Sequence, residues 1–485
     1  MEDSGKNTYG RLAGIPLPSE AKPSTDLHFG LIVPPSPFVV PCGWEWVHTA
    51  PFEGPSILAS LIKGLGYKFT LLDQRDNPDP GGLEGKLDQF DFIGVATYED
   101  NFPYVKKACE IAKENNGGRP VILGGPLVTS VPELLMKNTR ADYAVFGEGE
   151  LTTIELMDYL TGNAHALPVG GIDGLAWKNA EGEVSLNKPR EQMATLDAVP
   201  IQDLSVWERF KGRSIPEIYL SFSRGCPNNC SFCFRAMPRL RFKSVERVRR
   251  EIDYLKQHNF RMVWWNDLTF LANKAHVRRL LDDAFTAHDF RWCCFTRVTG
   301  VDLETLKHMK ARGCDLVMYG FESLSPKILD YYNKGISKND MLNAISLTRE
   351  AGLKVGGLFI VGAPGETKES LKWVVDFCRE FREVTRVKYL SAIPGTGLYK
   401  QAVKDGIIKD ELSHLYFLAR EQSVEGDVDK EGFLVFAEGL TKDDLREAYR
   451  QVNGVIERRP YDYSGPENVY LEECRKFEMR PLTPS

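Results

Sequence analysis

The stretch Arg224-Gly225-Cys226-Pro227-Asn228-Asn229-Cys230-Ser231-Phe232-Cys233 places three of the ten cysteines of the chain in the pattern C-x3-C-x2-C. A structural zinc site normally closes with four ligands, two of which usually lie in a distant second pair. No second C-x2-C occurs, and the adjacent Cys293 and Cys294, flanked by Trp292 and Phe295, fit a buried strand instead. Three thiolates would leave one iron of a four-iron cluster open, as a catalytic site requires. We therefore expect a catalytic metal centre here, with a zinc or structural site as the alternative.

The whole chain has the composition of an ordinary globular protein. Its 485 residues are 42% hydrophobic and 26% charged, with a net charge of −6, and predict two or three domains. Without a long Lys/Arg block, the sequence does not predict a nucleic-acid partner. Residues 1–27 are polar and predict a flexible leader, neither a signal peptide nor an anchor. No apolar run is long enough for a membrane span, so we expect a cytoplasmic protein with reduced thiols and no membrane partner.

Residues 28–160 alternate strand and helix patterns. Apolar runs such as His28–Val33 and Phe92–Ala96 read as buried strands, and Pro55–Leu65 and Tyr104–Glu114 read as helices. This alternation predicts a doubly wound parallel sheet of α/β class, in which a ligand binds beyond the carboxyl ends of the strands. Either a ligand site or simple tight turns would explain the residues at those ends, which are Asp73, Arg75, Thr97, Tyr98, Gly124, Gly125, Gly147, Glu148, Gly149 and Glu150.

Five short motifs follow one another in this region: Gly54-Pro55-Ser56, Leu72-Asp73, Ile93-Gly94-Val95, Leu123-Gly124-Gly125-Pro126 and Gly147-Glu148-Gly149-Glu150. In this order they resemble the Rossmann-like cobalamin-binding domain that precedes many radical S-adenosylmethionine (SAM) enzymes. The resemblance implies that the residues at the strand ends bind cobalamin.

One motif of some cobalamin proteins, Asp-x-His-x-x-Gly, is absent. His48 is the only His in the loop after the first strand and lacks both the Asp and the Gly, so we expect it to be structural or substrate-facing. The resemblance then implies cobalamin without a His ligand. Arg75 or Tyr98 could occupy its lower face, with solvated surface as the alternative for Arg75.

Residues 161–215 mix turn residues and short elements, which predicts a linker. It contains a plausible hairpin, 175–178 with 184–186, and no catalytic signal.

Residues 216–400 repeat a strand–helix unit six times, which predicts a partial (β/α)6 TIM-like barrel. The cysteine stretch follows the first of these strands. Because barrel sites lie at the carboxyl ends of strands, the polar residues there become candidates: Asn266, Asp267, Arg297, Glu322, Ser323 and Gly362.

The pattern C-x3-C-x2-C, with Phe232 before the last cysteine and Arg224-Gly225 before the first, resembles that of the radical SAM superfamily. The resemblance implies a [4Fe-4S] cluster on Cys226, Cys230 and Cys233, with SAM bound at the open iron. It also implies that Phe232 and the six barrel-end residues lie on the SAM side. The alternatives are helix capping for Asp267 and Ser323 and a surface ion pair for Arg297.

Residues 401–485 combine helical patterns with aromatic residues, and the resemblance implies a small helical region that caps the substrate. Residues 28–400 together resemble the cobalamin-dependent radical SAM enzymes. This implies an enzyme that moves a methyl group from methylcobalamin to an unactivated carbon or phosphorus of a small-molecule or peptide substrate in biosynthesis. An external flavodoxin- or ferredoxin-type electron donor is implied as well. The alternatives are an oxidative cyclase or ring-rearranging enzyme, a methylthiotransferase, and a noncatalytic cobalamin-binding protein.

Overall fold

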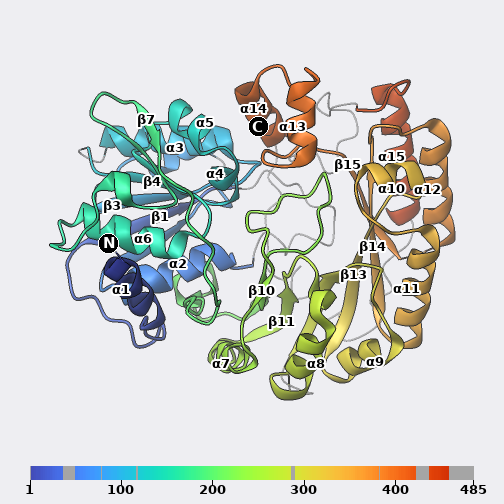
Figure 1. Cartoon of the computed structure of the whole chain (residues 1–485), viewed down its shortest axis with the longest axis horizontal. Helices are drawn as coiled ribbons and strands as arrows, with labels where there is room; N and C mark the ends of the chain where they lie inside the picture. Colours follow the sequence, from blue (N-terminus) through green and yellow to red (C-terminus); the bar gives the residue numbers. More distant parts are fainter. Residues whose placement is uncertain are drawn as a thin grey trace.

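Two sheets lie side by side in the computed structural model, the first formed by strands within residues 28–186 and the second by strands within residues 215–389 (Figure 1). The structure describes residues 2–35, 50–77, 79–115, 118–285, 290–381, 383–421 and 436–457. His48 therefore lies outside the described residues, and its predicted role stays a prediction.

The first sheet has the strand order β2-β1-β3-β4-β5-β6-β7. Its first five strands are parallel, and β6 and β7 join as an antiparallel pair. The strands are β1 (His28–Val33), β2 (Lys68–Asp73), β3 (Phe92–Ala96), β4 (Val121–Gly124), β5 (Tyr143–Val145), β6 (Leu175–Lys178) and β7 (Val184–Leu186).

The hairpin β6–β7 was expected in the linker, but it extends this sheet. Leu175 and Ala176 are fully buried and pair with Val145 and Ala144 of β5. Burial of these apolar side chains explains why the hairpin attaches to the sheet edge.

Helices cover both faces of the first sheet, as expected for a doubly wound fold. Helices α3 (Phe102–Asn115), α4 (Pro126–Ser130) and α5 (Pro132–Asn138) contribute to one core, which includes Phe102 and Leu135. Helices α2 (Glu53–Gly64) and α6 (Gly149–Leu160) contribute to the core on the other face, which includes Ile62 and Leu156.

The N-terminal residues differ from the flexible leader that the sequence predicted. Residues 2–13 form α1 (Glu2–Ala13), which packs against α6. Leu12 is 1% exposed and packs in a small core with Leu61 and Ile154, and Arg11 pairs with Asp158 at 2.5 Å. The polar composition concealed one apolar side of this helix.

The second sheet confirms the predicted partial barrel. Its six strands are all parallel and follow chain order, β8-β11-β12-β13-β14-β15. They are β8 (Ile215–Leu220), β11 (Phe260–Trp265), β12 (Arg291–Thr296), β13 (Cys314–Glu322), β14 (Lys354–Val361) and β15 (Val384–Tyr389). Cys293 and Cys294 lie buried in β12, as expected for a core strand.

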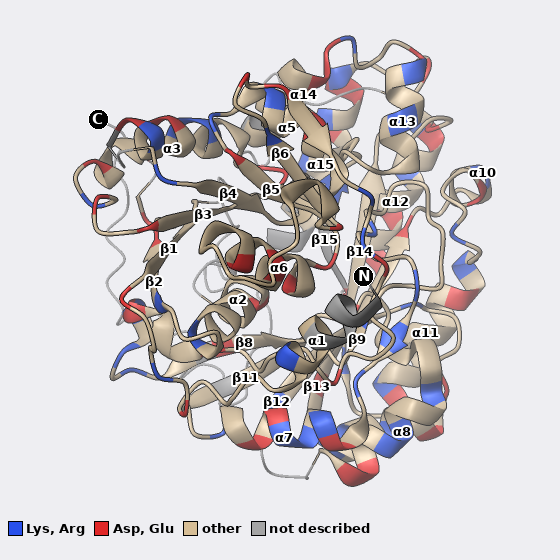
Figure 2. Cartoon of the chain, turned by 60° about the vertical axis from the view of Figure 1, so that its left-hand side comes forward, with Lys and Arg blue, Asp and Glu red and all other residues tan. Residues whose placement is uncertain are grey.

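Successive strand residues of this sheet point to opposite faces. Val263 and Trp265 join the large core that includes helix residues, whereas Met262 and Trp264 join a separate cluster on the inner face. The outer layer contains α7 (Val245–Leu255), α8 (Lys274–Asp283), α9 (Leu303–Ala311), α11 (Lys338–Glu350) and α12 (Lys368–Glu380). Figure 2 shows acidic and basic residues mixed along α7, α8 and α11, which is typical of solvent-facing helices.

The C-terminal helices bridge the two units. Helix α13 (Gly397–Lys404) follows the barrel, and α14 (Glu411–Glu421) packs against α3 of the first unit, where Tyr416 meets Phe102 edge-to-face at 5.3 Å. Helix α15 (Lys442–Glu457) packs on α12 and β15, so it extends the outer helical layer. The substrate cap expected for residues 401–485 stays a prediction, because 422–435 and 458–485 lie outside the described residues.

Among the described residues, no helix combines the length and the apolar character needed to cross a bilayer.

Candidate functional site

The cysteine stretch forms a loop beyond the carboxyl end of β8. Two short antiparallel strands, β9 (Ser223–Arg224) and β10 (Arg241–Phe242), bracket it. Gly225 opens the loop at φ 91°, and a Cβ there would lie 2.3 Å from the carbonyl oxygen of Arg239. Only glycine lets the two sides of the loop approach this closely.

The three thiols of this loop are free and differ in environment. Cys226 is buried, and its Sγ lies 3.5 Å from the Thr269 hydroxyl and 3.4 Å from the Asn228 amide nitrogen. Burial opposes ionisation of Cys226, but these hydrogen bonds outweigh it and lower its pKa. Cys233 is half-buried, and burial followed by repulsion from the neighbouring thiols raises its pKa to about 11. Cys230 is half-buried, with the Arg297 guanidinium 3.7 Å from its Sγ.

This donor set fits an iron–sulfur cluster better than a single ion. No three His, Cys, Asp or Glu side chains of the described residues are placed to hold one metal ion. In a four-iron cluster each cysteine binds a different iron, so the three thiols need not converge on one point. Free thiols on one glycine-hinged loop, at the edge where barrel sites form, are the arrangement that such a cluster requires.

The second candidate, Asp267, supports the base of the loop. It is 2% exposed and accepts hydrogen bonds from the Ser223 amide at 2.6 Å and the Ser223 hydroxyl at 2.5 Å. Burial raises the pKa of Asp267 to about 7, against the effect of these hydrogen bonds. Its contacts match a structural role for the loop, while the neighbouring Asn266 is exposed at the strand end.

Glu322 and Arg297 belong to a buried polar group near Cys230. Glu322 has φ 62° at a bulge of β13 and pairs with Lys334 at 2.7 Å, both side chains being more than nine-tenths buried. Arg297 donates to the Lys334 carbonyl, and the Lys334 ammonium lies 5.9 Å from the Phe232 ring. A non-glycine residue held in the left-handed region marks a constrained site.

The two remaining barrel candidates make local contacts. Ser323 is buried and accepts a hydrogen bond from the Ser325 amide at 3.1 Å. Gly362 has φ 94°, and its amide donates to the Glu366 carboxylate at 3.3 Å. These contacts fit turns at the ends of β13 and β14, and SAM binding by either residue stays a prediction.

In the first unit, Arg75 is buried rather than solvated. Its guanidinium forms a two-pronged pair with Asp73 at 2.9 Å and donates to the Ala50 carbonyl at 2.7 Å. It lies 4.6 Å from the Phe52 ring and 4.5 Å from the Trp207 ring. Burial opposes the charge of Asp73, but Arg75 outweighs it and lowers the pKa of that carboxyl. Arg75 thus holds several segments together at the carboxyl edge of the sheet.

Thr97, Tyr98, Gly124 and Gly125 meet at the carboxyl ends of β3 and β4. The Thr97 amide donates to the Gly124 carbonyl at 2.8 Å, and Tyr98 packs edge-to-face on Phe52 at 5.7 Å. Gly125 has φ 129°, and a Cβ there would lie 2.4 Å from the Thr97 carbonyl oxygen. The backbones therefore need glycine at position 125 regardless of any ligand.

Glu148 and Glu150, expected to contact cobalamin, form ion pairs with the barrel unit. Glu148 precedes α6 and accepts from Arg241 at 2.8 Å and from Arg224 at 3.1 Å, while Glu150 pairs with Arg224 at 2.6 Å. Gly147 has φ 78°, and Gly149 begins α6. Both carboxylates thus make an interdomain contact whose distant partners are invisible in sequence, and their contact with cobalamin stays a prediction.

Sequence reasoning missed Glu217, a residue of β8. This side chain is fully buried, and burial raises its pKa well above the usual range. The inner face around it is apolar and includes Trp264, Cys293, Met318, and the partly exposed Tyr219, Met262, Phe295 and Leu358.

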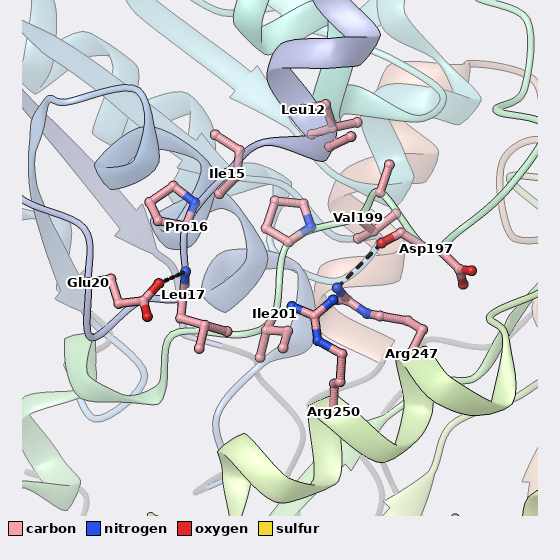
Figure 3. A pocket seen from close by; sticks show the side chains of 13 residues that line it. Leu12, Ile15, Pro16, Leu17, Glu20, Asp197, Val199, Ile201, Arg247 and Arg250 are labelled. Carbon is pink, nitrogen blue, oxygen red and sulfur yellow. Dashed lines mark hydrogen bonds between the residues drawn. The ribbon is translucent and has the colours of Figure 1, made fainter.

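Figure 3 shows a pocket of about 250 Å³ between the end of α1, the segment around Val199 and α7. Arg247 donates to the Asp197 carbonyl at 3.4 Å, and the Leu17 amide donates to Glu20 at 3.2 Å. The lining charges, Glu20, Asp197, Arg247 and Arg250, cancel, and none belongs to the predicted site.

Comparison with known proteins gives two family matches in one chain. The B12 binding domain matches residues 54–157, and the radical SAM superfamily matches residues 220–378. An uncharacterised methyltransferase of Pyrococcus horikoshii is 32% identical over 381 residues, covering 74% of this chain and 80% of the relative. The anaerobic magnesium-protoporphyrin IX monomethyl ester cyclase of Rubrivivax gelatinosus is 26% identical over 60% of this chain and 54% of its own length.

Among solved structures, the radical SAM methyltransferase TsrM of Kitasatospora setae, with cobalamin and a [4Fe-4S] cluster bound, superposes with a TM-score of 0.67 at 18% identity. The alignment covers 90% of this chain and 92% of TsrM.

A B12-binding domain joined to a radical SAM barrel defines an enzyme of the cobalamin-dependent radical SAM class. The chain belongs to the radical SAM methyltransferase family that uses cobalamin, a [4Fe-4S] cluster and SAM.

Proposed function

We propose that this protein transfers a methyl group from methylcobalamin to an unactivated carbon or phosphorus of a small-molecule or peptide substrate. One observation carries the proposal: the carboxyl ends of both parallel sheets face one another. Glu53 at the start of α2 accepts from the Ser221 hydroxyl just beyond β8 at 2.6 Å, and Glu150 pairs with Arg224. Because each sheet binds its ligand at that end, this arrangement favours two cofactors facing one substrate.

Residues of this chain would hold the cofactors and shield the site from water. Cys226, Cys230 and Cys233 would hold the cluster, and the polar group of Arg297 and Lys334 lies beside it. When bound, cobalamin supplies the methyl group, and SAM at the cluster supplies the radical that activates the substrate. The protein contributes position and exclusion of water.

The inner face of the barrel suggests the substrate class. Its apolar and aromatic side chains favour a substrate with an apolar or aromatic portion. Burial raises the pKa of Glu217 well above its usual range and so favours its neutral form beneath this apolar face.

Anaerobic reconstitution with iron, sulfide and cobalamin tests the cofactor content. We expect about four irons and about one retained cobalamin per chain, with iron lost in Cys230→Ala. Incubation with isotopically labelled SAM and candidate substrates then tests methyl transfer. A reconstituted protein that holds four irons but no cobalamin would refute the methyltransferase proposal.

An oxidative cyclase is the second candidate, because a relative that is named a cyclase is 26% identical to this chain. A product without an added methyl group would favour it. Methylthiotransfer is less favoured, although a putative methylthiotransferase of Methanocaldococcus jannaschii is 26% identical over 67% of this chain. That family places three further cysteines in its first domain, whereas this domain has only Cys42 and Cys109, and Cys109 is fully buried.

A further inference from the structure

Four charged side chains join the first unit to the barrel, and we call them the clamp: Glu148, Glu150, Arg224 and Arg241. Arg241 binds Glu148 with both terminal nitrogens, at 2.8 and 2.9 Å. Arg224 divides its guanidinium between Glu148 at 3.1 Å and Glu150 at 2.6 Å. Two-pronged Arg–carboxylate contacts fix orientation as well as distance.

The clamp is dry. The side chains of Glu148 and Arg241 are 2% and 6% exposed, Glu150 is 9% exposed and Arg224 is 20% exposed. Burial opposes the charge of Glu148, but Arg241 and Arg224 outweigh it and lower its pKa. Truncating one partner of such a buried pair leaves the other charge without compensation. The intact contact is therefore not readily replaced by contacts with water.

A third segment closes the clamp. The Met193 amide donates to Glu148 at 2.8 Å, and the Met193 carbonyl accepts from Arg241 at 2.8 Å and from Arg239 at 3.0 Å. The start of α6, the segment before the barrel and the β9–β10 ribbon are therefore bound to one another.

The clamp ends next to the cluster ligands. Arg224 is followed by Gly225 and then by Cys226, the first cysteine of the triad. Arg241 is the first residue of β10, where the same loop ends. Both ends of the cysteine loop are therefore held against the residues that open α6, at the carboxyl edge of the first sheet.

We propose that the clamp consists of positioning residues that set the cysteine loop, and with it the bound SAM, relative to the cobalamin domain. This rests on the proposed function. The step that needs this alignment is methyl loading: the S–CH3 bond of SAM breaks, a Co–CH3 bond forms with the electron pair of reduced cobalamin, and S-adenosylhomocysteine leaves. A chemical reductant such as titanium(III) citrate supplies the electrons. Reductive cleavage of SAM at the cluster, which forms 5'-deoxyadenosine, needs the barrel alone.

Glu150→Gln tests the proposal, because it removes one charge without changing the shape of the side chain. Glu155→Gln is the matched control, since Glu155 forms a similarly buried pair with Arg190, 8% and 11% exposed, within the first unit. We expect the ratio of methylcobalamin formed to 5'-deoxyadenosine formed to fall about tenfold in Glu150→Gln, as for a lost coupling of ~1.4 kcal/mol. The control should keep the parent ratio.

Hydrogen exchange of residues 225–240 in the cofactor-free protein gives a second, independent readout. We expect exchange there to accelerate about tenfold in Glu150→Gln and to stay unchanged in Glu155→Gln. An unchanged ratio together with unchanged exchange overturns the proposal, as does an equal loss of both products with loss of iron. If the parent protein forms no methylcobalamin, the proposed function fails, and the exchange experiment alone decides whether the clamp positions the loop.

Discussion

Replacing Gly225 by alanine should disrupt the cysteine loop far more than its one added methyl group suggests. Gly225 has φ 91°, which costs an L-residue about 1–2 kcal/mol. The new Cβ would also lie 2.3 Å from the oxygen and 2.6 Å from the carbon of the Arg239 carbonyl, and 2.9 Å from the Met237 carbonyl oxygen. These are backbone atoms, so relief requires the loop to open. Overpacking of this kind costs about 1–3 kcal/mol more.

Gly300→Ala is the matched control, because Gly300 has φ 82° in the same barrel unit and a Cβ at this position would have no neighbouring atom within 4 Å. It should lose only the dihedral cost of about 1–2 kcal/mol, against about 2–5 kcal/mol for Gly225→Ala. Urea unfolding of the cofactor-free proteins measures this difference. Iron content after anaerobic reconstitution should fall in Gly225→Ala and stay at the parent level in Gly300→Ala. Equal stability and full iron content in both variants would refute the steric reasoning.

Two further predictions concern buried charges. Glu217→Gln should stabilise the cofactor-free protein increasingly as pH rises above about 4. Burial raises the pKa of this acid in the folded parent, whereas its unfolded form ionises near pH 4.3, so the parent alone loses stability as pH rises. Urea midpoints at pH 5 and 8 that shift equally in parent and variant would contradict this. Arg75→Leu should lower the free energy of unfolding by about 2–4 kcal/mol. The loss is smaller than for a fully broken pair, because Asp73 keeps its ion pair with Arg209 at 2.5 Å. A free energy of unfolding, measured by thermal unfolding, within about 0.5 kcal/mol of the parent would show that the stacked guanidinium contributes little.

The fold was predictable because its signals are local. The strand–helix alternation of residues 28–160 and 216–400 gave a doubly wound sheet and a six-stranded partial barrel, and both are confirmed. The errors came from contacts between distant segments. Helix α1 and the hairpin β6–β7 looked like leader and linker because each exposes a polar side and buries its apolar side against a remote element.

The candidate site likewise combines local features that the sequence predicts with long-range contacts that it does not. Three cysteines within one loop, and their place after a barrel strand, were determined by sequence alone, because the ligand spacing of the loop is itself local. That Asp267 supports Ser223, and that Glu148 and Glu150 bind Arg224, was decided only by tertiary structure. These partners are 44, 76 and 74 positions apart, and a carboxylate in a sequence does not reveal which cation or amide will be buried beside it.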